Sequence, residues 1–420
     1  MQDNRYHFTL LRHGESEGNL KQLFQGQLDY PLSESGKRQA AVLARRWQLE
    51  EASFDRIVAS PLSRAQETAE IIAAQLGLAV ETDPLWMEQD FGEMNTLSIP
   101  EVVQDPQRPR FFTAFARAGR TGESKMQTFI RAGQALHTLL DRPPGRYLIV
   151  SHGALLNMVL YNALGIFPHP SAEGPWFAFH NTAFATLSYN PARHIWTVQG
   201  INDIHHLDEP LTPSGDYHIH FVRHAESEGN ANGLWQGRAD YPLTPRGRAQ
   251  AAALAQRWKR EEITFDHAIA SPLSRARHTA EIITTALGLP LELDPIWVER
   301  DNGLYAGTTP ENRNPPEPDY YPLHHPIGET GETLWELYIR GCQALNTILR
   351  RPPGRYLIVS HGGILNMTLY AALGITPMAN FQGVRFAFHN ASFAHLTYTA
   401  ARNRWQVLAV DDSLHLHDHS

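Results

Sequence analysis

Residues 10–19 read LLRHGESEGN and residues 221–230 read FVRHAESEGN, so one unusual stretch occurs twice in the chain. In both places an apolar run typical of a buried strand ends at an Arg-His pair, followed by a small residue and Glu-Ser-Glu-Gly-Asn. The functional crevice of an open α/β sheet lies beyond the carboxyl ends of its strands. The pair therefore stands where such a fold would place a site.

The repeated stretch belongs to a duplication that spans the chain. ASPLSRAQETAEII (59–72) returns as ASPLSRARHTAEII (270–283), and RPPGRYLIVSHGALLNM (142–158) returns as RPPGRYLIVSHGGILNM (351–367). The offset is 211 residues as far as Glu88 and 209 after it, which indicates a net deletion of two residues. Solenoid repeats have periods of roughly 20–50 residues. Each copy is therefore predicted to be a whole domain.

The boundary between the copies is predicted in DEPLTPSGDY (208–217), which is rich in Pro, Ser, Gly and Asp. We expect a first domain over residues 1–207 (repeat 1), a linker over 208–217, and a second domain over 218–420 (repeat 2). The copies end in INDIHHL (201–207) and VDDSLHL (410–416). These histidines lack carboxylates or thiolates at ligand spacing, so we interpret them as solvated rather than metal-binding.

Composition excludes several classes of protein. The 420 residues are 42% hydrophobic and 19% charged, which is typical of folded rather than disordered chains. A net charge of −8 without a basic stretch argues against nucleic-acid or anionic-membrane binding. The single cysteine, Cys342, excludes an intramolecular disulfide. The start MQDNRYHFTLLRHG does not resemble a signal peptide, and no run of 18 apolar residues occurs. We expect a soluble cytoplasmic protein.

Each repeat alternates predicted strands and helices. In repeat 1 the strand candidates are 7–11, 54–59, 146–150 and 183–189, and the amphipathic helices include 35–48 and 63–77. The second helix is expected to start from Ser60-Pro61 and to stop at Gly77. Unbroken apolar strands between helices predict the α/β class: two three-layer αβα domains, each a mostly parallel sheet with helices on both faces.

Three strand ends in each repeat deliver unusual polar residues to the same edge of the sheet. These residues are Arg12, His13, Arg64 and His152 in repeat 1, and Arg223, His224, Arg275 and His361 in repeat 2. A glutamate follows the second arginine at equal spacing in both, Glu88 or Glu299, with Asp90 and Asp301 as competitors two residues on. The glutamates are preferred.

Two arginines and two histidines would repel one another unless an anion lies between them. A phosphoryl group fits, because guanidinium groups match its oxygens and helix N-termini add N–H donors. The positive field also favours a neutral histidine that can attack phosphorus, and a carboxylic acid can protonate the leaving oxygen. Taken singly, these residues would more simply be surface or capping groups. Their joint occurrence at three strand ends favours a phosphate site.

With these motifs the chain resembles the histidine phosphatase superfamily, the phosphoglycerate mutase-like clan, over nearly all of both repeats. The motifs are RHGES and RHAES, QGQLDYPLSESGKRQA (25–40) and QGRADYPLTPRGRAQA (236–251), SPLSRAxxTAE, and SHGxxLN. The resemblance implies that His13 and His224 are nucleophiles that form phosphohistidine. Arg12, Arg64 and His152, with Arg223, Arg275 and His361, then form the phosphate pockets, and Glu88 and Glu299 match the proton donor. Asn19 and Gln25, with Asn230 and Gln236, match phosphate-binding positions, and no metal or organic cofactor is implied.

The segment between the acid and the last histidine distinguishes the branches of this family. Mutases carry a longer insertion there, so the 64- and 62-residue intervals favour the phosphatase branch. After the acid, repeat 2 keeps the family's pattern as GLYAG (303–307), whereas repeat 1 has GEMNT (92–96). Residues 95–125 contain five cationic residues, four arginines and Lys125, whereas residues 306–334 contain one cationic residue, Arg313. From this composition we expect repeat 1 to prefer the more anionic phosphoesters.

The sequence thus predicts a metal-independent phosphomonoesterase with two active sites, acting on a small phosphorylated metabolite rather than on nucleic acid or membrane. Two alternatives stay open: a cofactor-dependent phosphoglycerate mutase, and a phosphate-ligand or phosphoprotein binding module with one or both copies inactive. Because many soluble proteins pair through two-fold interfaces, the fused repeats are also a candidate pseudo-dimer within one chain.

Overall fold

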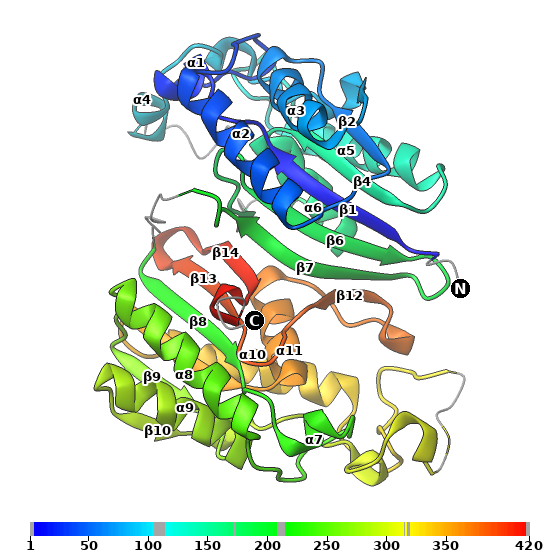
Figure 1. Ribbon diagram of the computed structural model, residues 1–420, viewed down its shortest axis with the longest axis vertical. Coiled ribbons are helices and arrows are strands. Elements are labelled where there is room, and N and C mark those ends of the chain that lie inside the picture. Colours follow the sequence, from blue (N-terminus) through cyan, green and yellow to red (C-terminus); the bar gives the residue numbers. More distant parts are fainter. Residues whose placement is uncertain are drawn as a thin grey trace. The chain divides into compact units, whose positions relative to one another are not determined.

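The computed structural model describes residues 4–104, 114–170, 174–207, 215–314, 316 and 320–416. The chain divides into two compact units, Met1–Thr212 and Pro213–Ser420 (Figure 1). The division falls inside the segment 208–217, of which residues 208–214 lie outside the described ranges. Within those ranges no helix is long and apolar enough to cross a membrane.

The sheet of repeat 1 has four parallel strands and two antiparallel ones. Its order is β7 (Ile195–Asp203), β6 (Phe184–Asn190), β1 (Tyr6–Arg12), β4 (Arg146–Ser151), β2 (Arg56–Ala59) and β3 (Val80–Thr82). Strands β1, β4, β2 and β3 pair in parallel, and β6 joins β1 and β7 in antiparallel fashion. The four predicted strands are present. The two that were not predicted, β3 and β7, are mostly half-buried and lack a continuous apolar run.

Repeat 2 forms the same sheet in the same order. Its strands are β14 (Arg404–Asp412), β13 (Phe393–Thr399), β8 (Tyr217–Arg223), β11 (Gly354–Ser360), β9 (His267–Ala270) and β10 (Leu291–Leu293). The pairings β8–β11, β11–β9 and β9–β10 are parallel, and β13 is antiparallel to β8 and β14. Each repeat also has one short strand, β5 (Trp176–Phe177) or β12 (Gly383–Phe386).

Helices cover both faces of each sheet. In repeat 1 they are α1 (Glu17–Leu20), α2 (Glu34–Leu49), α3 (Ser63–Leu76), α4 (Ile99–Gln104), α5 (Lys125–Leu140) and α6 (Gly153–Leu164). In repeat 2 they are α7 (Glu228–Ala231), α8 (Pro245–Arg260), α9 (Ser274–Leu287), α10 (Leu334–Leu349) and α11 (Gly362–Leu373). In repeat 1, α2 and α3 bury their apolar sides against one face in a shared core with Leu11, Ile57 and Val150. Helices α5 and α6 pack together on the other face (Figure 1). The predicted αβα fold is confirmed.

Helix α3 begins at Ser63, the first residue of the predicted range 63–77, and Ser60 lies between β2 and this helix with its hydroxyl oxygen 2.8 Å from His152 Nε2. Gly77 ends the helix as predicted, in the left-handed conformation at φ 69° that favours glycine. The terminal histidines are not simply solvated. His206 contacts the Thr182 hydroxyl at 2.8 Å, and burial lowers its pKa to about 4, while His415 of repeat 2 is buried.

Candidate active site

Strand register brings the predicted residues of repeat 1 to one edge of the sheet. Arg12 pairs with Ser151 at the ends of β1 and β4, and Ala59 pairs with Val150 at the ends of β2 and β4. The pairing of β1 with β4 extends one residue beyond β1, because His13 N donates to the Ser151 carbonyl at 3.0 Å. Parallel strands in this register end together. Residues 50 to 140 positions apart in sequence therefore meet at one place, which we call site 1; its counterpart in repeat 2 is site 2.

The histidine after β1 is held in one orientation. His13 is buried, and its Nδ1 lies 2.6 Å from the Gly14 carbonyl oxygen. A carbonyl oxygen only accepts, so Nδ1 carries the proton and Nε2 of the neutral ring has a free lone pair. His224 repeats this arrangement with the Ala225 carbonyl at 2.8 Å.

The two arginines of site 1 are also fixed by backbone carbonyls. Arg64, in the first turn of α3, is only 1% exposed and donates through Nη1 to Leu28 O at 2.9 Å and through Nη2 to Gly26 O at 2.8 Å. Arg12 donates through Nη1 to Phe179 O at 2.6 Å. Arg275 and Arg223 make the matching bonds in repeat 2. These bonds orient both guanidinium planes without neutralising their charge.

The second histidine of site 1 faces the first. His152 is the residue before α6, and its Nε2 lies 2.8 Å from the Ser60 hydroxyl oxygen. Its ring centroid is 5.1 Å from that of His13, and the distance from His224 to His361 in site 2 is also 5.1 Å.

Three buried nitrogens in each site have no hydrogen-bond partner among the described residues. They are Arg12 Nε, Arg64 Nε and His152 Nδ1 in site 1, and Arg223 Nε, Arg275 Nε and His361 Nδ1 in site 2. Buried polar atoms are almost always paired in folded proteins. The same three positions recur in both repeats, so they mark a binding site for an acceptor-rich group. A phosphoryl group, with its several negatively charged oxygens, has the required chemistry.

Burial and charge set the protonation of these groups. Burial, reinforced by Arg64 and Arg12, holds the pKa of His13 well below its usual value. Burial, Arg64 and His13 do the same to the pKa of His152. Burial also lowers the pKa of Arg64 to about 10, although Glu88 opposes this shift. His13 is therefore neutral around pH 7, in the state that can attack phosphorus.

Glu88 lies at the N-terminus of α6, beside these groups. Its Oε1 accepts from the backbone N–H groups of Gln89 at 2.8 Å and Leu155 at 3.0 Å, and its Oε2 accepts from Ala154 at 3.2 Å. Glu299 makes the same three contacts in repeat 2. Asp90, by contrast, accepts from Gly92 N at 2.8 Å in the turn that follows. The geometry thus favours the glutamate over its competitor.

The predicted amide residues line the start of α1. Ser16 donates through its backbone N–H to Asn19 Oδ1 at 3.1 Å and through its hydroxyl to Gln25 Oε1 at 2.7 Å. These bonds occupy the amide oxygens, so the NH₂ groups are the donors that remain for an acceptor. Asn230 and Gln236 make the same contacts with Ser227. All fourteen residues predicted for the two sites therefore fall into two matching clusters.

Sequence reasoning missed the groups that hold the acid. Arg131 of α5 donates to the carbonyls of Met87 at 2.6 Å and Glu88 at 3.0 Å, and it pairs with Glu123 at 2.6 Å. Arg340 and Glu332 form the same pair in repeat 2 at 2.7 Å. Asn181, also missed, donates to the His13 carbonyl at 3.1 Å, as Asn390 does to His224 at 3.0 Å. Each of these residues is identical at the matching position of the other repeat, and this identity could have indicated them from the sequence.

The atypical GEMNT segment keeps the backbone shape of its counterpart. Gly92–Met94 and Gly303–Tyr305 both form a short 3₁₀ turn, and Met94 and Tyr305 are both buried. Of the cations predicted to line site 1, Arg108 and Arg110 lie outside the described residues. Arg120 is 80% exposed and pairs with Glu93. Lys125 lies over the Tyr161 ring at 5.3 Å. In the described part of the chain, no three His, Cys, Asp or Glu side chains are placed to hold a metal ion.

Both repeats match one family in comparisons with known proteins. The model of the histidine phosphatase superfamily (branch 1) matches residues 8–204 and again residues 219–412. The chain is 33% identical over 208 residues to a probable phosphoglycerate mutase GpmB of Yersinia enterocolitica, and 34% identical over 208 residues to that of Cronobacter sakazakii. Each alignment covers 48% of this chain and 94% of the relative.

Among solved structures, a phosphoserine phosphatase of Entamoeba histolytica in complex with 3-phosphoglyceric acid is 26% identical, with a TM-score of 0.42. That match covers 48% of this chain and 98% of the other. The family model matches nearly the whole of each repeat. The chain belongs to the histidine phosphatase superfamily, branch 1, and contains the domain of that family twice.

Proposed function

We propose that the protein is a phosphomonoester hydrolase that works through a phosphohistidine intermediate and has one active site in each repeat. The observation that carries the proposal is the recurrence, at both sites, of a neutral buried histidine beside three buried nitrogens without partners. A binding module would need the cations but not a histidine oriented for attack. The fixed Nδ1–H of His13 and His224 therefore supports catalysis.

In the first step, His13 Nε2 attacks phosphorus, the N–P bond forms, and the bond from phosphorus to the ester oxygen breaks. Glu88 gives its proton to that oxygen, which leaves as an alcohol. Arg12, Arg64 and His152 hold the remaining phosphoryl oxygens and stabilise the charge that develops on them. In the second step, Glu88 takes a proton from water, the water oxygen attacks phosphorus, and the N–P bond breaks. Inorganic phosphate leaves, and both residues return to their starting states.

A phosphoglycerate mutase is the second candidate, because the curated relatives that are one third identical are named as probable mutases. The short segments between acid and last histidine support hydrolysis instead, since they leave less chain to shield a phosphoenzyme from water. The two functions are separable by experiment. A mutase isomerises monophosphoglycerates when bisphosphoglycerate is added, whereas a hydrolase releases inorganic phosphate without it.

The test is hydrolysis of an aryl phosphate in the presence of EDTA by the wild-type chain, H13A, H224A and the double variant. We expect activity in the first three and a loss of at least about 10³-fold in the double variant, because no nucleophile remains. Rapid quenching in alkali, in which the N–P bond is stable, should detect phosphohistidine in each single variant and none in the double variant. Activity that persists in the double variant, or that requires a metal, would contradict the proposal.

Three further expectations belong to the same proposal. The substrate is a small phosphorylated metabolite rather than nucleic acid or membrane lipid, in keeping with the net charge of −8. The free Cys342 is compatible with a reducing cytoplasm. We also propose that the repeats pair as a pseudo-dimer, and solution scattering that fits two non-touching domains would contradict this arrangement.

A further inference from the structure

The two sites differ at a loop position that touches the acid. In repeat 1 the loop 25–29 holds site 1 together, because its carbonyls bind Arg64 and Asp29 accepts from Ser63 N at the start of α3. The loop 236–240 does the same in repeat 2. Gln27, midway along loop 25–29, donates through Nε2 to the Glu88 carbonyl at 3.0 Å. At the matching place in loop 236–240, Arg238 has its Nε 3.5 Å from the Glu299 carbonyl oxygen.

A second exchange of the same kind follows the acid directly. Gln89 donates through Nε2 to the Glu123 carbonyl at 3.0 Å. Arg300 occupies this position in repeat 2 and donates through Nε to the Glu332 carbonyl, also at 3.0 Å. Each side chain thus keeps its backbone partner while a neutral amide is replaced by a guanidinium. Arg300 is 8% exposed, and Arg238 is 45% exposed at the surface of the same wall.

These exchanges change the charge of the wall beside the acid. Both repeats share three carboxylates and one guanidinium there, namely Glu88, Asp90, Glu123 and Arg131, or Glu299, Asp301, Glu332 and Arg340. Repeat 2 adds two guanidinium groups, so the formal charge of this wall is two units more positive than in repeat 1. The contacts of Arg238 to Asp301 at 3.5 Å and to Glu332 at 3.7 Å are long for ion pairs. An anion of the substrate can therefore compete for this guanidinium.

A third difference lies on the flank of the two sites. His389 Nδ1 lies 2.5 Å from the buried carboxylate of Asp411, which raises the pKa of His389. In repeat 1 the same contact joins His180 to the neutral amide of Asn202 at 3.0 Å. His389 is flanked by residues that bind the site, since Phe388 O accepts from Arg223. The exchange adds the carboxylate of Asp411 to the flank of site 2 together with a histidine whose protonation that carboxylate favours.

We propose that site 2 selects phosphomonoesters whose leaving group carries a second negative charge, with Arg238 as the residue that determines this preference, and that site 1 does not. The inference rests on the proposed hydrolase function and names its substrate class. It reverses the preference expected from the composition of the inserts. That expectation relied on five cations: Arg120 is paired with Glu93, Lys125 lies over Tyr161, Arg117 is exposed, and Arg108 and Arg110 lie outside the described ranges.

The test measures each site alone, with H13A reporting site 2 and H224A reporting site 1. The substrates are matched pairs: 3-phosphoglycerate with glycerol 3-phosphate, and propane-1,3-diol bisphosphate with its monophosphate. We expect the ratio of kcat/KM, charged over neutral, to be about 10- to 100-fold higher at site 2, the size of one charge-assisted hydrogen bond. The two pairs separate a carboxylate from a second phosphoryl group. Equal ratios at both sites for both pairs would overturn the inference.

Reciprocal exchanges assign the effect to one residue. R238Q in the H13A background should lower the ratio toward that of site 1, and Q27R in the H224A background should raise it. R355Q is the matched control, because Arg355 is an exposed arginine at the opposite end of β11 from Ser360. A ratio that R238Q leaves unchanged, or that R355Q lowers equally, would contradict the role of Arg238.

Binding separates this inference from the proposed function. Phosphonate analogues with a carboxylate or a hydroxymethyl terminus cannot be hydrolysed, so calorimetry gives a ratio of dissociation constants even for an inactive chain. Unequal ratios at the two sites without any hydrolysis would contradict only the proposed function. Hydrolysis with equal ratios, or no binding of either phosphonate at site 2, would contradict the inference.

Discussion

The two repeats hold the histidines and arginines of sites 1 and 2 in nearly the same geometry and differ around them. His152 lies 2.8 Å from the Ser60 hydroxyl and His361 lies 2.8 Å from that of Ser271, and both pairs of histidine rings are 5.1 Å apart. The neighbouring wall changes from Gln27 to Arg238. Strand register and helix N-termini set the positions of the clustered histidines, arginines and glutamates, whereas loop side chains set the charge of the neighbouring wall. Divergence after the duplication has therefore spared the first set and altered the second.

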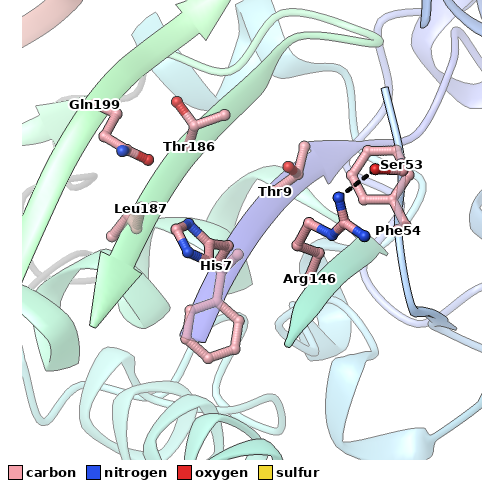
Figure 2. A pocket seen from close by; sticks show the side chains of 9 residues that line it. His7, Thr9, Ser53, Phe54, Arg146, Thr186, Leu187 and Gln199 are labelled. Atoms are coloured by element: carbon pink, nitrogen blue, oxygen red, sulfur yellow. Dashed lines mark hydrogen bonds between the residues drawn. The ribbon is translucent and has the colours of Figure 1, made fainter. Parts of the chain in front are cut away.

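A second contrast lies within the sheets, between β1 and β6 in repeat 1 and between β8 and β13 in repeat 2. In repeat 1, Thr9 and Thr186 are cross-strand partners beside a pocket of about 200 Å³, lined also by Phe54 and Arg146 (Figure 2). In repeat 2 the matching partners are His220 and His395, whose rings stack 3.8 Å apart. The imidazoles occupy space that threonines leave open. This exchange concerns the stability of one repeat rather than its chemistry.

The largest expected effect tests whether both repeats use one mechanism. E88Q in the H224A background and E299Q in the H13A background should each lower kcat for an alkyl phosphate by about 10²–10⁴-fold, because glutamine cannot donate the proton. The loss should be smaller for a nitrophenyl phosphate, whose leaving oxygen needs no proton. Steady-state assays of the two substrates check this. A loss confined to one repeat would show that the other uses a different acid.

The stacked histidines predict that acid weakens repeat 2 more than repeat 1. Burial lowers the pKa of His220 well below its usual value and that of His395 to about 3. The groups facing this pair are His218 and Arg257, which disfavour protonation, and Asp412, which favours it. Because the folded pKa values are depressed, the unfolded chain binds more protons below about pH 6.5. Each of these two histidines then lowers the free energy of unfolding by up to about 1.4 kcal/mol for each unit that the pH falls.

Urea unfolding of the full chain between pH 7.5 and pH 5 measures this effect. The H220T/H395T variant, which copies Thr9 and Thr186, should lose less stability on acidification than the wild type. The reciprocal T9H/T186H variant should lose more. Parallel pH profiles for the wild type and H220T/H395T would contradict the prediction.

The smallest effect concerns the residue after the nucleophile. A Cβ added at Gly14 would lie 2.6 Å from the Gly36 carbonyl oxygen, yet repeat 2 accommodates Ala225 at this position. We expect G14A to destabilise the chain by about 1–3 kcal/mol through overpacking, and A225G to cost about 0.8 kcal/mol through loss of one buried methyl group. Denaturant titrations give both values. Equal costs would mean that the backbone around Gly14 adjusts as freely as that around Ala225.

The sequence by itself determined the duplication, the αβα fold and most of each site. Apolar runs that end in Arg12-His13 or Ser151-His152 predict both a buried strand and a polar strand end, and parallel strands bring such ends together. The membership of His13, Arg64 and His152 in one cluster was predictable for this reason. The weaker strands β3 and β7 were not, because their residues are mostly half-buried and carry little periodic signal.

Only the tertiary structure decided how the acid and the pocket wall are arranged. The sequence alone does not distinguish Glu88 from Asp90 as the acid. In the structure, the N-terminus of α6, more than 60 positions later, donates to the carboxylate of Glu88, whereas Asp90 accepts from Gly92 N. The contact of Arg238 with the Glu299 carbonyl likewise joins residues 61 positions apart. Loop side chains obey no period, so their partners are set by the packing of distant elements rather than by local pattern.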